Sequence, residues 1–280
     1  MIMPHAKHPL PQLFVLALFW IAVLLAAFAP RPAAAEGFAD KLVEKGKLTI
    51  GTTGASPPST MYDIDGKLVG LDIDLAEKIA RDLDLEVEFV VLDWAAMLAG
   101  VQAGRFDMVA SSVARTPARV ESADFFISQA YVANGVGGAV HRDNEKVKSW
   151  ADACGGSVGI VKGAAQINTV KEKFGEACFT SITEYPGWTE LLLDLQNKRI
   201  DLVVGNYITP AYLIKSTSRP ISLLDEALAI NGNALVIQRG NPELAQEVDK
   251  LLEKYQDDGS LAEITEKWIG TPLDLKLIAQ

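Results

Sequence analysis

The pattern of apolar and polar residues changes its period many times along the chain. Apolar residues that recur every three or four positions predict amphipathic helices, and short apolar or alternating runs predict strands. In the first half the expected strands cover 48–52, 86–92 and 106–111, and the expected helices cover 72–83 and 94–104. The segment 53–62 is rich in Ser, Pro and Thr, and its Pro57-Pro58 pair excludes a helix or a central strand. Helices that alternate with strands indicate an α/β fold with a parallel or mixed sheet.

The second half repeats this order of elements. The expected strands cover 158–161, 178–182 and 200–204, and the expected helices cover 163–174, 188–198, 243–255 and 261–268. Two further segments, 130–140 and 227–238, have the Gly-rich or extended pattern of strands. They would carry the chain out of a first lobe and back to it, and two crossing strands make a hinge.

One stretch of sequence occurs twice, 94 residues apart. The shared positions are Trp94, Leu98, Gln102, Arg105, Asp107 and Val109 in the first copy, and Trp188, Leu192, Gln196, Arg199, Asp201 and Val203 in the second. Each copy predicts an amphipathic helix, a basic turn and a short apolar strand that ends in small polar residues, Ser111-Ser112 or Gly205-Asn206. Because ligands in open α/β sheets bind beyond the carboxyl ends of strands, the repeat predicts two similar lobes with a ligand cleft between them. Asp107 and Asp201 are expected to be turn or cap residues rather than catalytic carboxylates.

The N-terminus has the three parts of a secretory signal peptide. They are a basic residue at Lys7, an uninterrupted apolar run over 13–29, and the small residues Ala33-Ala34-Ala35. We expect residues 1–35 to be cut off before Glu36, which indicates a periplasmic protein. The alternative is an uncleaved membrane anchor, but the run is at the short end of the about 20 residues that a span requires. No Cys follows the run, which excludes a form that is cut and lipid-anchored at a Cys.

Charge and cysteine content narrow the function further. The net charge is −10 and the pI is near 4.9, with no basic cluster, which argues against binding to nucleic acid or anionic lipid. In an oxidising compartment the two cysteines, Cys154 and Cys178, are expected to form a disulfide. It would close a loop of about 25 residues and stabilise the fold by roughly 3 kcal/mol. A reactive thiol is the alternative, but no His lies near either Cys in the sequence.

Four motifs together point to one family. They are G-K-L-T-I-G-T-T at 46–53, D-G-K-L-V-G-L-D-I-D-L-A at 65–76, G-R-F-D-M-V-A-S-S-V-A-R-T-P-A-R at 104–119, and S-A-D-F-F-I-S-Q-A-Y at 122–131. Through them the chain after the signal peptide resembles the extracellular solute-binding proteins, family 3, of polar amino-acid ABC transporters. The resemblance implies a periplasmic binding protein-like α/β fold, in which a two-strand hinge joins two lobes around a ligand cleft. Lobe 1 would comprise 36–131 plus 230–280, and lobe 2 would comprise 132–229.

The resemblance also implies roles for residues of the first lobe. Arg119 would grip the α-carboxylate of the ligand, since a guanidinium stays charged and offers a planar, two-pronged donor. Ser111 and Ser112 would hold the carboxylate and ammonium through hydroxyl and backbone groups, with capping of the strand end as the alternative. Trp94 would form a wall against the ligand side chain, with a position in the core as the alternative. Its repeat mate Trp188 has weaker support for the same role.

Small residues replace hydroxyl-bearing ones at three positions of the site. Ala164 and Ala165 stand in the V-K-G-A-A-Q loop at 161–166, where relatives usually have Thr or Ser, and Ala114 replaces another Ser or Thr. The backbone N–H groups remain as donors, and the start of a helix favours an anion.

Asn206 is the most informative departure, because relatives mostly carry there an Asp that pairs with the ligand's α-ammonium. An Asn can accept a hydrogen bond but brings no charge. The aromatic residue often found near Ser56 is missing, and Thr53 stands where binders of cationic ligands often have Asp, which argues against Lys, Arg or ornithine. Three ligand classes follow: an amino acid held weakly at its amine, a derivative with an altered amine, or a small carboxylate without an amine.

The resemblance favours the substrate-binding component of an ABC importer. The protein would be a monomer without a cofactor that closes on an amino acid or a related small carboxylate and then docks on a membrane permease. One alternative is an enzyme on the same scaffold, similar to cyclohexadienyl dehydratase. The matched cleft positions hold no carboxylate for acid–base chemistry, which leaves Glu184, near Trp188, as the remaining candidate. His141 is the single His after the signal peptide, which excludes a multi-His metal site. A ligand-sensing receptor component is the other alternative, since it would use the same closed lobes.

Overall fold

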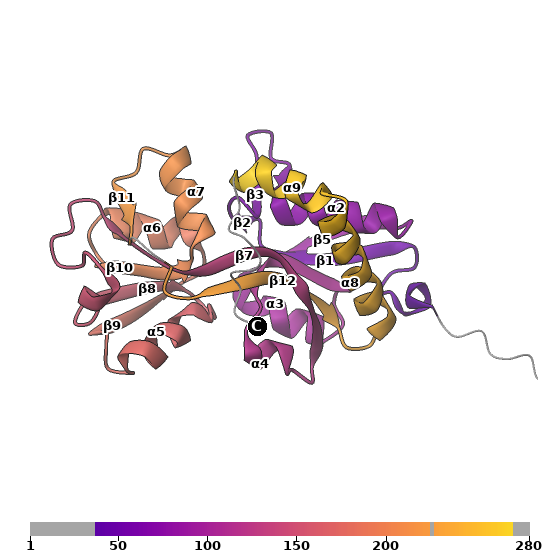
Figure 1. The fold of residues 1–280 in the computed structure, drawn as a ribbon, viewed down its shortest axis with the longest axis horizontal. Coiled ribbons are helices and arrows are strands. Elements are labelled where there is room, and N and C mark those ends of the chain that lie inside the picture. Colours follow the sequence, from indigo (N-terminus) through magenta and orange to yellow (C-terminus); the bar gives the residue numbers. More distant parts are fainter. Residues whose placement is uncertain (1–36, 225–226, 271–280) are drawn as a thin grey trace, which may run out of the picture. The chain divides into compact units, whose positions relative to one another are not determined.

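The computed structural model describes residues 37–224 and 227–270, and the signal peptide expected at 1–35 lies outside the described residues. Figure 1 shows how the elements are arranged. The strands are β1 (Lys47–Thr52), β2 (Ala55–Ser56), β3 (Thr60–Tyr62), β4 (Leu68–Val69), β5 (Glu86–Val91), β6 (Met108–Ala114), β7 (Phe125–His141), β8 (Ser157–Val161), β9 (Ser181–Tyr185), β10 (Leu202–Asn206), β11 (Ile221–Leu223) and β12 (Ile230–Gln238). The helices are α2 (Leu71–Asp82), α3 (Trp94–Gln102), α4 (Pro117–Val120), α5 (Gln166–Phe174), α6 (Trp188–Gln196), α7 (Ile208–Ser216), α8 (Pro242–Asp257) and α9 (Ser260–Ile269), with 3₁₀ turns η1 (Phe38–Lys41) and η2 (Trp150–Asp152).

The long strands follow one hydrogen-bonded path with the order β5-β1-β6-β12-β7-β10-β8-β9, and β11 pairs with β7. β1 is parallel to β5 and β6, and β8 is parallel to β9 and β10. β7 and β12 run antiparallel to their neighbours. The mixed α/β fold expected from the alternating pattern is therefore confirmed, with one parallel group at each end of the path.

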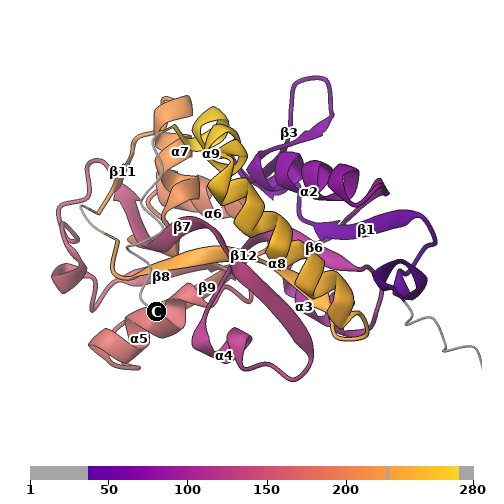
Figure 2. The ribbon, with the colours of Figure 1, turned by 45° about the vertical axis from the view of Figure 1, so that its right-hand side comes forward.

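Two adjacent strands carry the chain between these parallel groups. β7 pairs with β12 over 125–135 and then with β10 over 136–139, so one strand belongs to both halves. β12 lies beside it, between β6 and β7. Figures 1 and 2 both show β7 and β12 side by side between the part with α5 and α6 and the part with α2 and α8. This is the expected two-lobe fold with a hinge of two strands.

Each lobe has its own apolar core on both faces of its strands. In lobe 1, α2, α8 and α9 pack on the face that carries Met108 and Ala110, and α3 packs on the opposite face with Val109. In lobe 2, α5 packs on the face of Leu202, and α6 packs on the opposite face with Val203. Successive side chains of a strand point to opposite faces, so these short apolar strands are covered on both sides by helices.

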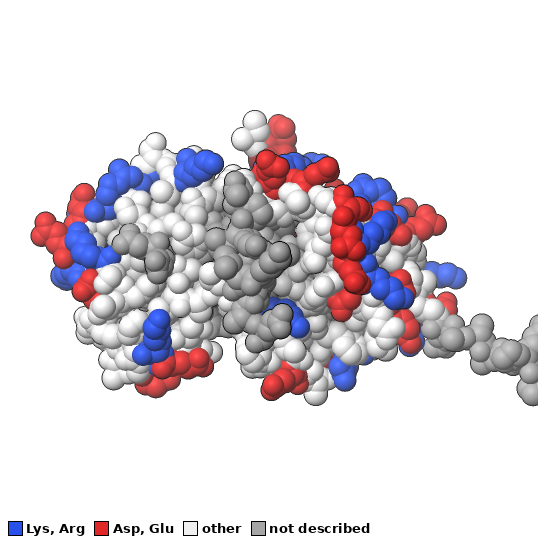
Figure 3. Space-filling model, viewed as in Figure 1, with Lys and Arg blue, Asp and Glu red and all other residues white. Residues whose placement is uncertain are grey.

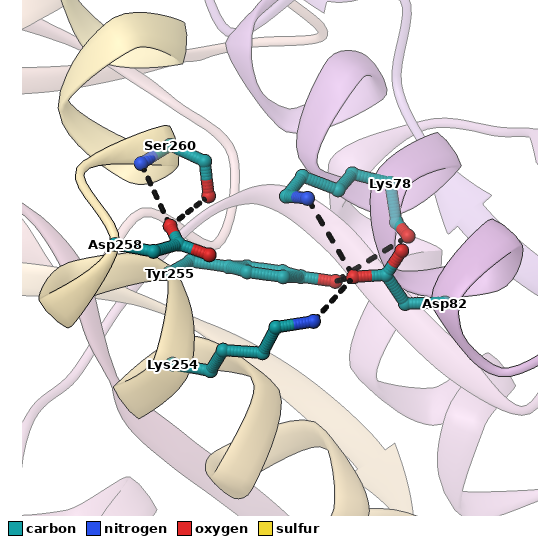
Figure 4. Close-up of polar contacts among 6 residues, drawn as sticks. All are labelled: Lys78, Asp82, Lys254, Tyr255, Asp258 and Ser260. Atoms are coloured by element: carbon teal, nitrogen blue, oxygen red, sulfur yellow. Dashed lines mark hydrogen bonds and ion pairs between the residues drawn. The ribbon is translucent and has the colours of Figure 1, made fainter.

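Polar contacts also fasten α8 to α2, as Figure 4 shows. The Tyr255 hydroxyl donates to Asp82 Oδ2 at 2.9 Å. The ammonium groups of Lys78 and Lys254 each lie 3.5 Å from the same oxygen, and Lys78 Nζ also lies 4.3 Å from the centre of the Tyr255 ring. These contacts tie α8, late in the chain, to α2, early in the chain, within lobe 1.

The repeated segment places two aspartates in equivalent turns, as expected for turn residues. The Asp107 carboxylate accepts hydrogen bonds from N and Oγ1 of Thr49 at 2.9 and 2.6 Å. The Asp201 carboxylate accepts hydrogen bonds from N and Oγ of Ser157 at 3.0 and 2.8 Å. The aspartates thus fasten β1 to the start of β6 in lobe 1, and β8 to the start of β10 in lobe 2.

The expected disulfide between Cys154 and Cys178 is confirmed. The strand expected at 178–182 is wrong in its bounds, because β9 begins at Ser181. Cys178 lies instead in the turn after α5, where its carbonyl accepts a hydrogen bond from Gly155 N at 2.6 Å. Cys178, at the apolar start of the expected strand, therefore belongs to a buried disulfide and not to the sheet.

Two other segments differ from the expectation. The loop expected at 53–62 contains the short strands β2 and β3, which form a small sheet with β4, and its Pro57–Pro58 peptide bond is cis. The helix α7 has no counterpart among the expected elements. Its Pro210 lies in the first turn, where a missing N–H removes no hydrogen bond of the helix.

The surface agrees with the acidic composition. In the view of Figure 3, acidic and basic side chains are interspersed over the region of α2, α8 and α9, and no basic patch gathers on this face among the described residues. Within 37–224 and 227–270, none of the helices combines the length and the apolar character that crossing a membrane requires.

Candidate ligand-binding site

A pocket lies at the carboxyl ends of β6 and β10, where the two lobes face each other. Its cavity is small, with a volume of about 50 Å³. The lining residues are Ser56, Trp94, Ser111, Ser112, Ala114, Arg119, Val161, Ala164, Ala165, Gln166, Trp188, Gly205 and Asn206. Each site residue predicted from the sequence, with the exception of Thr53, is brought together here.

Among the described residues that line the pocket, Arg119 alone has an ionisable side chain. It lies in the single turn of α4, and its Nη1 donates to Ala114 O at 2.8 Å. Its guanidinium carbon lies 5.7 Å from the centre of the Trp94 ring, within reach of a cation–π contact. Among the described residues no carboxylate forms an ion pair with Arg119, and burial lowers the pKa of the guanidinium below its usual value. The pocket therefore presents a partly buried cation with free donors.

The end of β6 is held in an unusual conformation. Ser112 has φ +51°, in the left-handed region, which costs about 1–2 kcal/mol for a residue other than Gly. Its N–H donates to Asp72 Oδ2 at 2.6 Å, and Asp72 Oδ1 accepts a hydrogen bond from the Tyr131 hydroxyl at 2.8 Å. Asp72 and Tyr131 are both buried. The carboxylate at the start of α2 thereby offsets the cost of the bend that turns Ser112 toward the pocket.

The burial of Asp72 predicts a pH dependence of stability. Burial raises the pKa of its carboxyl to about 7, although the hydrogen bonds from Tyr131 and Ser112 act in the opposite direction. Between about pH 4 and pH 7 the folded chain then binds more protons at this group than the unfolded chain, so its contribution to stability is lost as the pH rises through this window. We expect Asp72→Asn to remove a loss on the order of 4 kcal/mol between pH 4 and pH 8. Urea unfolding of both proteins at these two pH values measures it, and equal losses in the two proteins would contradict the assignment.

Trp188 forms the wall of the pocket on the side of lobe 2. It starts α6 and is buried, and its ring packs against Gly205 near the end of β10. A Cβ atom at Gly205 would lie 2.6 Å from Cη2 of the Trp188 ring, which is closer than real contacts allow. Glycine at this position therefore lets the indole lie against the strand, next to Asn206.

Asn206 ends β10 and is buried at the pocket. Its Oδ1 accepts a hydrogen bond from Thr209 N at 2.8 Å, in the first turn of α7, so the side chain serves as a helix cap. No group among the described residues accepts a hydrogen bond from its Nδ2. Because a backbone N–H can only donate, the oxygen must face Thr209, and the NH₂ group is left for the pocket.

The loop before α5 also lines the pocket on the side of lobe 2. Ala164 and Ala165 precede the first residue of α5, Gln166. The N–H of Ala164 donates to Val161 O at 2.9 Å and is not the free donor that the sequence predicts, whereas the N–H groups of the first helical turn have no partner within the helix. Trp94 Nε1 of lobe 1 donates to Gly163 O of this loop at 3.3 Å. This hydrogen bond links the two lobes across the mouth of the pocket.

Thr53 does not line the pocket but contacts Ser111, which does. Its Oγ1 accepts hydrogen bonds from Ser111 Oγ at 3.2 Å and from Ala55 N at 3.3 Å, so it supports Ser111 rather than lining the cavity. Val161 and Gln166 also line the pocket, although no motif singles them out individually. Their signal is their position at the two ends of the V-K-G-A-A-Q loop.

Asp72 carries no obvious sequence signal for its role behind Ser112. It lies within the 65–76 motif, next to the apolar stripe of α2, and its contacts with Ser112 N and the Tyr131 hydroxyl explain why an acid is buried there. Metal binding finds no support in the described part of the chain, where no three His, Cys, Asp or Glu side chains gather to hold an ion.

Comparisons with known proteins agree with this geometry. The model of the bacterial extracellular solute-binding proteins, family 3, matches residues 48–271. The L-cystine-binding protein TcyJ of Escherichia coli (strain K12) is 27% identical over 248 residues, which cover 88% of this chain and 91% of TcyJ. A solved structure of an ancestral arginine-binding protein bound to arginine is 30% identical, with a TM-score of 0.74 over 81% of this chain and 99% of that one. The ancestral amino acid-binding protein AncCDT-1, a precursor of cyclohexadienyl dehydratase, is 28% identical, with a TM-score of 0.72 over 80% of this chain and 96% of that one.

Proposed function

The chain belongs to the bacterial extracellular solute-binding proteins of family 3, and from that premise we propose that it captures an amino acid or a related small carboxylate for an ABC importer. The observation that carries the proposal is Arg119, a partly buried guanidinium on the pocket wall without an ion-pair partner among the described residues. A buried charge without a counter-ion is unfavourable. A ligand carboxylate would supply the missing negative charge and accept two parallel hydrogen bonds from the guanidinium. The L-cystine-binding and arginine-binding relatives support a ligand of this class.

Binding would proceed by closure of the lobes. The hydrogen bond from Trp94 Nε1 to Gly163 O spans the pocket and fits a closed arrangement, and β7 and β12 provide two adjacent strands about which the lobes could rotate. We place lobe 1 at 36–131 plus 230–280 and lobe 2 at 132–229. In this scheme Arg119, Ser111 and Ser112 bind the ligand first, and the loop before α5 closes over it.

The cellular setting is part of the proposal. We place the protein in the periplasm as a monomer whose closed form docks on a membrane permease, in keeping with its extracellular solute-binding relatives. A sensory role would use the same closed form with a membrane receptor as the partner.

Catalysis is the second candidate, because AncCDT-1 is described as a precursor of cyclohexadienyl dehydratase. Acid–base catalysis requires a proton donor or acceptor within hydrogen-bond reach of the substrate. None of the described residues that line the pocket is Asp, Glu, His, Lys, Cys or Tyr. Asp72 is a buried acid that contacts the lining residue Ser112. Its two carboxylate oxygens already accept hydrogen bonds from Ser112 N and the Tyr131 hydroxyl. The geometry therefore favours binding without turnover.

A thermal-shift screen tests the proposed function. The panel holds the twenty amino acids, their 2-oxo acids, N-acetylated amino acids and small mono- and dicarboxylates. A ligand at one hundred times its Kd stabilises the folded state by about 2.7 kcal/mol, so we expect at least one carboxylate to raise Tm by several degrees. The proposal fails if no carboxylate raises Tm. Consumption of a binding compound, followed by NMR, would instead favour the enzyme.

A further inference from the structure

The donors and acceptors of the pocket decide between the ligand classes that the sequence leaves open. An amino acid presents a carboxylate and an ammonium on the same carbon, and the two groups need opposite partners. Arg119 meets the requirement of the carboxylate. The question is which described group would meet the requirement of the ammonium.

Asn206 presents a donor where an ammonium would need an acceptor. Its Oδ1 is engaged by Thr209 N at 2.8 Å, which leaves its Nδ2 as the side-chain group that can bond to a ligand in the pocket. An Asp in the same place would cap α7 with one oxygen and keep a second, charged oxygen for the ligand. The exchange of Asp for Asn thus turns a charged acceptor into a neutral donor at the end of β10.

The remaining lining residues bring no negative charge either. The polar side chains besides Arg119 and Asn206 belong to Ser56, Ser111, Ser112 and Gln166, and all are neutral. Among the described residues, the lining of the pocket therefore carries one positive charge, and the ligand that balances it is a monoanion. A zwitterion would bring a second, uncompensated positive charge out of water, which is unfavourable in a buried site.

From this balance we infer that the pocket selects carboxylates that bear a neutral hydrogen-bond acceptor where an amino acid bears its ammonium, and 2-oxo acids are the simplest members of this class. The carboxylate lies against Arg119, and the 2-oxo oxygen accepts a hydrogen bond from Asn206 Nδ2. The rings of Trp94 and Trp188 flank the side chain of the acid. The inference rests on the proposed function and specifies the ligand class of the same site.

Matched ligand pairs test the inference by isothermal titration calorimetry. The pairs are pyruvate with L-alanine, 4-methyl-2-oxopentanoate with L-leucine, and phenylpyruvate with L-phenylalanine, which cover small, branched and aromatic side chains. We expect the 2-oxo acid to bind at least 10-fold more tightly than its amino acid in the pair with the highest affinity. In Asn206→Asp we expect the order to reverse, because the acid still caps Thr209 and adds a charged acceptor for the ammonium.

Gln166→Glu is the matched control, since it adds the same charge to the pocket at the start of α5. We expect it to weaken both members of a pair without reversing their order. A wild-type protein that binds the amino acid as tightly as the 2-oxo acid would overturn the inference and leave the proposed function intact. Failure of Asn206→Asp to reverse the order, or an equal reversal in Gln166→Glu, would overturn the role of Asn206. If none of the six compounds binds to the wild-type protein, the same comparison is made between the tightest-binding 2-oxo acid and amino acid of the thermal-shift panel, and the proposed function falls only if no carboxylate of that panel binds.

Discussion

Replacing Arg119 by Ala is expected to weaken the binding of a carboxylate ligand at least 100-fold while leaving Tm nearly unchanged. The guanidinium would make two charge-assisted hydrogen bonds to the carboxylate, and each is worth about 1.5–3 kcal/mol. Their loss corresponds to a factor of roughly 10² to 10⁴ in Kd. The fold itself relies little on this side chain, because its recorded contacts are one hydrogen bond to Ala114 O and a ring contact with Trp94.

Two further variants separate charge from geometry in this prediction. Arg119→Lys keeps the positive charge but loses the planar fork, so we expect an intermediate loss of affinity. Arg115→Ala is the matched control, because Arg115 lies four residues away, donates to Ser128 O at 3.1 Å and does not line the pocket. Its affinity should equal that of the wild type. Calorimetry that finds unchanged affinity in Arg119→Ala would show that the carboxylate binds elsewhere.

Periodicity in the sequence was sufficient for most of the fold because helices and short buried strands leave strong local patterns. The repeat at Trp94 and Trp188 predicts two helices, and both begin at these residues in the structure. The failures occur where a distant contact decides the local structure. Cys178 looks like the start of a strand, but its crosslink to Cys154 holds it in a turn. The sequence does not predict α7 because Pro210 interrupts the helical pattern, although a proline is permitted in the first turn of a helix.

The candidate site shows the same division between local and distant information. The identity of its lining residues follows from strand ends and from the family motifs, so all the predicted residues except Thr53 come together in one pocket. Their hydrogen-bond roles do not follow from the sequence. That Asn206 offers its NH₂ group depends on Thr209, and the bend at Ser112 depends on Asp72, forty positions earlier in the chain. In the proposed selection of 2-oxo acids, ligand selectivity would depend on these hydrogen bonds behind the pocket lining.

Replacing Asp107 by Asn is expected to lower the free energy of unfolding by about 2–4 kcal/mol without affecting ligand affinity. The carboxylate is buried and accepts hydrogen bonds from N and Oγ1 of Thr49, from Val43 N at 2.9 Å and from Gln238 Nε2 at 2.9 Å. An amide retains one acceptor oxygen and places an NH₂ group against donors, so at least one buried N–H loses its partner. The loss is measured by urea unfolding followed by circular dichroism.

Asp201→Asn provides the matched control within the same chain, because the repeat places Asp201 in the equivalent turn of lobe 2. Its carboxylate also accepts from N and Oγ of Ser157, but the side chain is 28% exposed and its other recorded contact is an ion pair with Lys146 at 3.6 Å. Water can replace partners that are lost at an exposed site, so we expect a loss of about 1 kcal/mol. Equal losses for the two variants would contradict the explanation, since Asp107 is buried and accepts two more hydrogen bonds, from Val43 N and Gln238 Nε2, than Asp201.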